Sequence, residues 1–132
     1  TGDYGDMARF VHSLGYIAQH GGDLEKAERQ FRESLRMFRR LGNRRGIAES
    51  LAGLAGIMAR QGQLHRGTTM LAAAERLLLS TGGAWWPADR VEVEQNLDFI
   101  QAALDEKSFN EFWSTGSEMT LDQTINFLDE ER

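Results

Sequence analysis

Apolar residues return every three or four positions along most of this chain, the spacing that places them on one face of an α-helix. Residues 1–20 and 24–41 each carry such a face, and Gly21 and Gly22 interrupt the pattern between them. Asp23 precedes the second run and is expected to cap its first turn. The pattern predicts two helices joined by a tight turn, the first of which should bury Phe10, Val11, Leu14, Ile17 and Ala18.

Five further helices are predicted after residue 41. Residues 47–58 and 64–78 carry a second pair of apolar faces, broken around Gly62. Pro87 suits the first turn of a helix, where no backbone donor is needed, and this helix should run to about residue 105. A shorter helix around Phe112 follows, and Thr120 with Gln123 has the spacing of a capping box that opens a last helix. With seven helices and no strand candidate, we predict an all-α fold.

The chain also repeats itself at a shift of 40 residues. Thr1-Gly2-Asp3 aligns with Leu41-Gly42-Asn43 and again with Thr81-Gly82-Gly83. Such a period is typical of stacked helix pairs. We predict two helix-turn-helix units of about 40 residues in residues 1–80. A degenerate third unit with C-terminal capping helices should then occupy residues 81–132. Because Thr1 stands at a linker position, we expect an earlier repeat to precede it in a longer polypeptide.

Composition narrows the class of protein. The chain has 132 residues, no cysteine and a formal charge of −5, and it lacks any run of the roughly 18 apolar residues that a membrane helix needs. A disulfide framework and a membrane span are therefore not expected, and we expect a cytoplasmic protein. Residues 1–88 carry +4 (12 basic, 8 acidic) and residues 89–132 carry −9 (3 basic, 12 acidic). Direct nucleic-acid binding is not expected from this balance.

Sequence motifs for catalysis or metal binding are missing. His12 and His20 lie eight residues apart, and His65 stands far along the chain, which is not the spacing of metal ligands on a helix. The glycines do not form a phosphate-binding loop. We therefore expect no catalytic residue, no metal and no cofactor. The basic cluster is interpreted as the solvated face of an outer helix: Arg29, Arg32, Arg36, Arg39, Arg40, Arg44 and Arg45.

Residues 1–80 resemble tetratricopeptide repeats (TPR). Leu14-Gly15 followed by Ala18, Ala27 and Phe31 is similar to the family signature, in which small residues stand where two helices approach closely. Val11 departs from the signature tryptophan. The resemblance implies a right-handed superhelix of antiparallel helix pairs whose concave face binds a protein or peptide. It implies these groove positions: Arg9, His12, Tyr16, Gln19, His20, Glu49, Gly56, Arg60, Glu92 and Asn96.

In that groove, Gly56 should leave room for an intruding side chain, and the third unit gives the least secure positions because it has left the repeat pattern. The exposed ends of a repeat stack also make a homo-oligomer conceivable. Trp85 and Trp86 have two interpretations, an exposed anchor for a partner or a structural closure of the preceding repeat.

Residues 82–128 resemble the C-terminal end of large bacterial signalling ATPases that often carry LuxR-type DNA-binding domains. The resemblance rests on Trp85-Trp86-Pro87, on Phe109 to Trp113 and on the closing helix from Leu121 to Leu128. It implies a protein-interaction or signal-sensing module of a bacterial transcriptional regulator. A small-molecule sensor with a closed cavity is the alternative, and a carboxylate hydrolase is a third hypothesis.

Overall fold

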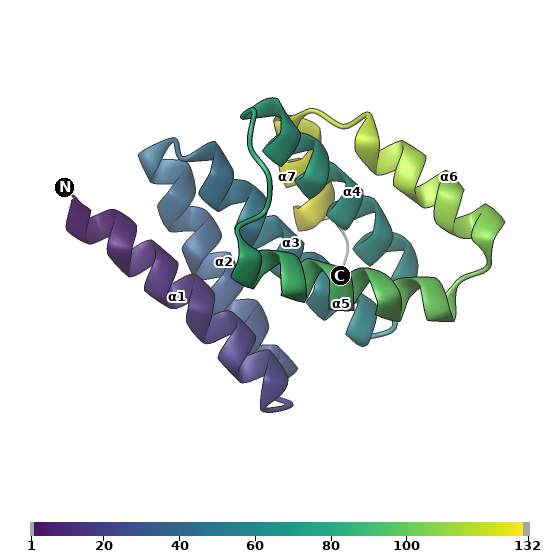
Figure 1. Ribbon diagram of the computed structural model, residues 1–132, viewed down its shortest axis with the longest axis horizontal. Helices are drawn as coiled ribbons and strands as arrows, with labels where there is room; N and C mark the ends of the chain where they lie inside the picture. The colour runs from purple at the N-terminus through teal and green to yellow at the C-terminus, as the bar shows by residue number, and fades with distance from the viewer. Residues whose placement is uncertain (1, 131–132) are drawn as a thin grey trace.

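The computed structural model describes residues 2–130, which form seven helices and no strand (Figure 1). Thr1 and residues 131–132, at the two ends of the predicted units, lie outside the described residues. The predicted all-α class is confirmed. The helices are α1 (Gly2–His20), α2 (Leu24–Leu41), α3 (Arg44–Arg60), α4 (Leu64–Ser80), α5 (Pro87–Ala103), α6 (Glu106–Ser117) and α7 (Leu121–Asp129).

Local signals in the sequence set the helix ends. The Asp23 carboxylate accepts a hydrogen bond from the backbone N–H of Lys26 at 3.0 Å, as predicted for a cap. Thr120 and Gln123 form the predicted capping box. The glycines at positions 22, 42, 62 and 82 all have positive φ, between 67° and 88°, which glycine adopts without steric cost. Each of the first four helices is therefore followed by a glycine in the left-handed conformation, at intervals of 20 residues. Two such intervals make up one 40-residue repeat.

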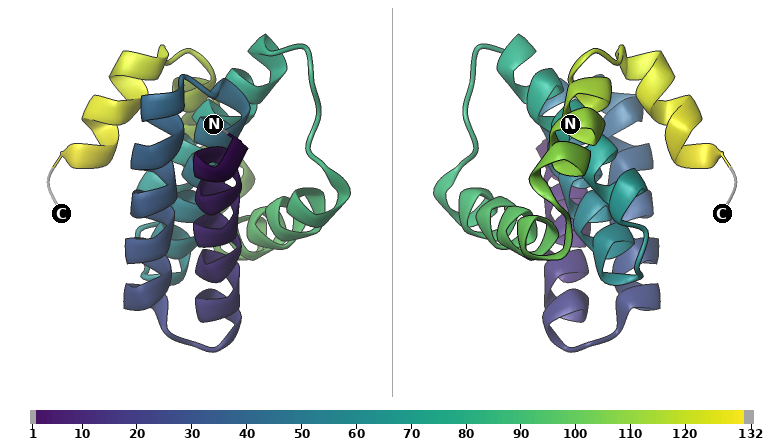
Figure 2. Two further views of the ribbon diagram at one scale, coloured as in Figure 1. Left: turned by 90° about the vertical axis from the view of Figure 1, so that its left-hand side faces the viewer. Right: turned by 90° about the vertical axis from the view of Figure 1, so that its right-hand side faces the viewer.

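Two helix hairpins, α1–α2 and α3–α4, pack side by side and form the core (Figures 1 and 2). Phe31 of α2 is fully buried at their junction. Gly15 and Gly53 both lie against its ring, and a Cβ atom at either position would clash with it. The predicted role of small residues around Phe31 is thus confirmed. Close helix approach also explains why α3 tolerates glycines in its interior, which otherwise destabilise a helix by about 1 kcal/mol each.

The buried face predicted for α1 is wrong at two positions. Phe10 is 64% exposed and Ile17 is 67% exposed. Their equivalents 40 residues later, Ser50 and Ile57, are buried because α2 packs against that face of α3. No helix of residues 2–130 packs against the corresponding face of α1, so its apolar side chains face outward.

The third unit departs from the repeat in its helix order. α6, and not α5, packs along α4 in the way that α3 packs along α2. Gly116 of α6 allows this approach, because a Cβ there would clash with the backbone carbonyl of Thr69. α5 therefore lies outside the stack and crosses α3 on the face formed by α1 and α3 (Figure 2).

α7 covers a different side of the stack. It packs against α4, where Ile125 and Leu128 are buried, and Arg66 donates a hydrogen bond to the carbonyl of Leu128 at 3.0 Å. Among residues 2–130, no helix combines the length and the apolar character that a membrane span requires.

Candidate functional site

The structure brings the ten predicted groove residues together, where α5 crosses α1 and α3. Five come from α1, three from α3 and two from α5 itself. They do not form an open groove, because α5 lies on them. Six of the ten are less than 9% exposed: His12, Tyr16, Gln19, Glu49, Gly56 and Asn96.

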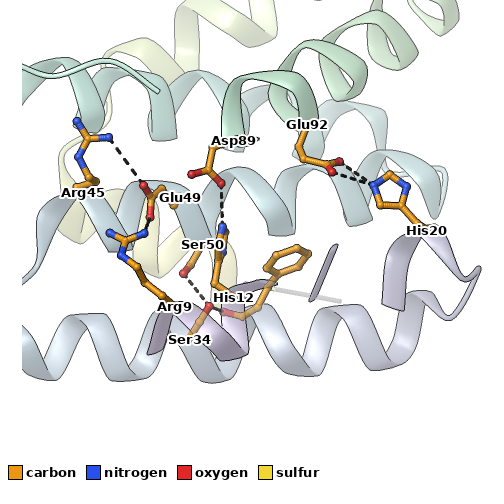
Figure 3. A network of polar contacts seen from close by, with 10 residues as sticks. Arg9, His12, His20, Ser34, Arg45, Glu49, Ser50, Asp89 and Glu92 are labelled. Carbon is orange, nitrogen blue, oxygen red and sulfur yellow. Dashed lines mark hydrogen bonds and ion pairs between the residues drawn. The ribbon is translucent and has the colours of Figure 1, made fainter. Parts of the chain in front are cut away.

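Two histidines of α1 hold the first turns of α5 (Figure 3). Nε2 of His12 lies 3.0 Å from Oδ1 of Asp89, and both side chains are largely buried. Two turns further along α1, Nε2 of His20 lies 2.8 Å from Oε2 of Glu92. The two contacts are eight residues apart in α1 but only three residues apart in α5. Unequal spacings of this kind fit two helices that cross at an angle.

Asn96 anchors the middle of α5 on α3. Its amide sits against Gly56, at the place where a Cβ atom would otherwise stand. Nη1 of Arg60 donates to Oδ1 of Asn96 and also lies 3.3 Å from the carbonyl of Gly56. The room predicted at Gly56 thus exists, and Asn96 of the same chain fills it.

The segment before α5 is fixed by two arginines and a tryptophan. The guanidinium groups of Arg9 and Arg45 lie 4.2 and 4.8 Å from the ring of Trp86, within the range of a cation–π contact. Arg45 also donates to the carbonyl of Ala84 at 2.8 Å. Trp86 remains 46% exposed. Trp85, by contrast, is partly buried against the core, so the structural interpretation fits Trp85, and Trp86 stays accessible.

Glu49 is the buried charge at the centre of the site. Arg9 donates to its Oε1 at 2.8 Å, and Arg45 lies 3.8 Å from its Oε2 (Figure 3). Burial raises the pKa of the Glu49 carboxyl, and the nearby Asp89 carboxylate raises it further, whereas Arg9 opposes the change. Burial also raises the pKa of the Tyr16 phenol well above its ordinary value and lowers that of Arg60.

Several buried polar atoms of this site have no hydrogen-bond partner. In residues 2–130, eight buried side-chain atoms are in this state, and five of them belong to predicted groove residues. Such atoms cost free energy because they have lost water without replacing it. Their concentration on one face sets it apart from the rest of the fold. The five are His12 Nδ1, Tyr16 OH, Gln19 Oε1, Glu49 Oε2 and Asn96 Nδ2.

Three side chains of the site could offer metal ligands. One ligand atom from each of His12, Glu49 and Asp89 lies within 4.8 Å of the others. The spacing of histidines could not reveal this set, because its members come from α1, α3 and α5. Arg9 and Arg45 already pair with the Glu49 carboxylate, and the His12 ring contacts Asp89, which disfavours a further cation there.

Arg45 is the site residue that the sequence did not single out. The interpretation of residues 29–45 as a solvated face fits Arg32 and Arg36, which pair with Glu28 and Glu33 on their own helix. Arg45 differs because it starts α3 and points at the loop before α5. Only its place after the cap at Asn43 distinguishes it in the sequence.

Comparison with known proteins agrees with this geometry. The family model described as tetratricopeptide repeat matches residues 6–78, which is more than half of the 132 residues. The match spans both hairpins and stops before α5. No curated protein and no solved structure matches the chain significantly. From the two stacked hairpins, the packing of Phe31 and this match, the chain belongs to the tetratricopeptide repeat family.

Proposed function

We propose that this chain is a non-catalytic protein-interaction module whose concave face, formed by α1 and α3, binds a helical segment of a protein partner. Tetratricopeptide repeats generally mediate protein–protein interaction, and stacked helix pairs offer an extended concave surface for it. One observation carries the proposal. The positions that the family uses for ligands are, in this chain, the positions that hold α5.

α5 shows which kind of helix can bind to the face formed by α1 and α3. Its inner side presents one residue per helical turn, and all four are buried. A helix that lays one face into a groove is a recurring mode of peptide recognition. The four residues are Asp89, Val93, Asn96 and Ile100.

The wider context of the proposal is a cytoplasmic regulator of bacterial transcription. The resemblance of residues 82–128 to the C-terminal end of signalling ATPases supports it. In such a protein, the module would sense or dock a partner, and the output would come from other domains.

A small-molecule sensor has less support. A hollow of about 360 Å³ lies between α1 and the start of α5, and its volume falls in the range of ligand sites. It is open to solvent, however, and several charged side chains line it, whereas a ligand cavity usually encloses most of its ligand. The lining residues are Arg9, His12, Ser13, Tyr16, Trp86, Ala88, Asp89 and Glu92.

A hydrolase also has less support. Glu49 and Asp89 approach each other, and the pKa of Glu49 is raised, as paired catalytic carboxylates require. The side chain of Glu49 has no exposed surface, however, and Arg9 occupies one of its oxygens. A substrate therefore has no access to this carboxylate while α5 is in place.

Site-specific photocrosslinking tests the interaction function. A photoreactive amino acid at Ser13, an exposed position beside the hollow, should form a covalent adduct with a particular protein in the cell of origin. The same group at Arg36, an exposed position of α2, is the control. Absence of an adduct from position 13, or the same adducts from both positions, would contradict the proposal.

A further inference from the structure

We propose that α5 is a removable occupant of the concave face, and that the partner is an acidic amphipathic helix of another protein that takes its place. This inference rests on the proposed function and specifies the partner and the regulation of the same site. The protein would then be closed by its own helix until a competing helix binds.

Polar contacts hold α5 as much as apolar contacts do. Of the four residues that α5 buries, two are apolar, Val93 and Ile100, and two are polar, Asp89 and Asn96, while Leu97 adds a partly buried apolar side chain. The neighbouring contact between α2 and α3 buries two whole phenylalanine rings, Phe31 and Phe38, against glycines of α3. Because apolar burial is the dominant favourable term in folding, α5 should be the more easily released element.

The fit of α5 on the face of α1 and α3 is incomplete, because it leaves buried polar atoms of that face without hydrogen-bond partners. Gln19 Oε1 is a buried acceptor without a donor, and neither the Tyr16 hydroxyl nor Nδ1 of His12 has a hydrogen-bond partner. Leaving such a group unsatisfied costs about 1–3 kcal/mol. A partner helix with hydrogen-bond donors at these points would gain what α5 does not supply. The incomplete fit thus favours exchange.

Histidines of the face meet acidic side chains of α5. The face presents His12, His20 and Arg60 toward α5, where His12 contacts Asp89, His20 contacts Glu92 and Arg60 donates to Asn96. Arg9 pairs with Glu49 of the face itself. Arg60 also lies 4.9 Å from the ring of Phe99. A competing helix needs the same chemistry. It should carry acidic residues three positions apart, an amide four positions later, and an aromatic residue near either end.

α5 can dissociate from the face while the other helices keep their packing. α6 packs directly on α4 and does not depend on α5 for its place. The segment before α5 contains Gly82 and Gly83, and the segment after it consists of Leu104 and Asp105. Both connections keep α5 tethered near the face, so its effective concentration is high and a partner must compete with it.

A binding experiment with a synthetic peptide tests the inference. The probe is a fluorescent peptide of residues 85–103, which carries the chemistry of α5. It is titrated into the whole chain and into the double variant Asp89→Ala/Glu92→Ala, which removes two anchors from α5 and leaves the face unchanged. The control is Glu94→Ala/Asp98→Ala, which removes two exposed carboxylates from the outer side of α5. Fluorescence anisotropy gives Kd, and circular dichroism reports the helix content of each variant.

The anchor variant should bind the peptide at least about tenfold more tightly than the unchanged chain and the control, because its own helix competes less. Equal Kd values for all three proteins would overturn the inference while leaving the interaction function standing. Absence of binding to every protein would overturn the assignment of an acidic helix as partner, and the adduct at position 13 then decides separately on the proposed function. Loss of helicity beyond α5 in the anchor variant would also overturn it, since α5 would then be part of the core.

Discussion

Phe31 illustrates what a single residue reveals about this fold. Its ring fills the space between Gly15 and Gly53 and lies 4.8 Å from the ring of Tyr16. The signature positions of the repeat predicted this core because small residues must stand where two helices meet a large ring. The same reasoning could not predict that Tyr16 and His12 would be buried, because burial there depends on α5.

The substitution Phe31→Ala should lower the free energy of unfolding by about 3–5 kcal/mol, because it removes a fully buried ring and the flanking glycines cannot fill the space. Urea unfolding followed by circular dichroism measures the change. A loss below about 1 kcal/mol would mean that this ring does not hold the two hairpins together.

The Tyr16 hydroxyl should contribute nothing favourable to stability at neutral pH. It is buried and has no hydrogen-bond partner, so Tyr16→Phe should leave the unfolding temperature unchanged or raise it. A clear loss of stability in this variant would show that the hydroxyl has a hydrogen-bond partner, and the fit of α5 on the face would then be more complete than we infer.

Tyr16 should also make stability depend on pH in alkaline solution. Its pKa is raised in the folded state, chiefly by burial, so above pH 10 the phenol ionises more readily in the unfolded chain. The unfolded state then binds fewer protons, and stability falls as the pH rises. Thermal unfolding between about pH 9 and 11 should show Tyr16→Phe gaining stability relative to the unchanged chain. A constant difference across this range would contradict the burial of the phenol.

At the level of the elements, the sequence predicted α5 as a helix but not its position. Pro87 and the apolar spacing indicate where α5 begins and which side is buried. They do not say against which helices that side packs. The 40-residue period suggested a first helix of a third repeat, whereas α6 takes that place because Gly116 permits its close approach to α4. Long-range placement of this kind is encoded in complementary surfaces and not in periodicity.

Hydrogen exchange should show that α5 is held less firmly than the helices of the two hairpins. Backbone amides in the middle of α5 should exchange at least about tenfold faster than those in the middle of α3, because α5 can open without unfolding the hairpins. Mass spectrometry of exchanged peptides measures the two rates. Equal protection of α5 and α3 would mean that α5 opens only when the whole chain unfolds.

The whole molecule is a stack with two unlike ends. The outer side of α6 is polar and exposed at Glu106, Lys107, Asn110 and Glu111, as expected of a capping element. The outer side of α1 exposes Met7, Phe10 and Ile17. The corresponding side of α3 is covered by α2, so the α1 end of the stack is the apolar one.

Self-association through α1 should follow from this difference. Sedimentation velocity over a concentration series should show association of the unchanged chain, and Phe10→Ser/Ile17→Ser should reduce it because the apolar face is removed. Leu79→Ser, which changes an exposed apolar residue of α4, serves as the control. If both variants associate to the same extent as the unchanged chain, the α1 face is not the contact.

The distance between α1 and α5 tests the account most directly. The sequence has no cysteine, so spin labels on Asp6→Cys and Glu94→Cys, both exposed positions, report this distance without interfering thiols. Double electron–electron resonance should give one narrow distance distribution for the otherwise unchanged chain. After Asp89→Ala/Glu92→Ala it should show a second, broader population, in which α5 has left the face. A broad distribution without the anchor substitutions, or an unaltered one with them, would contradict the account of a concave face filled by its own releasable helix.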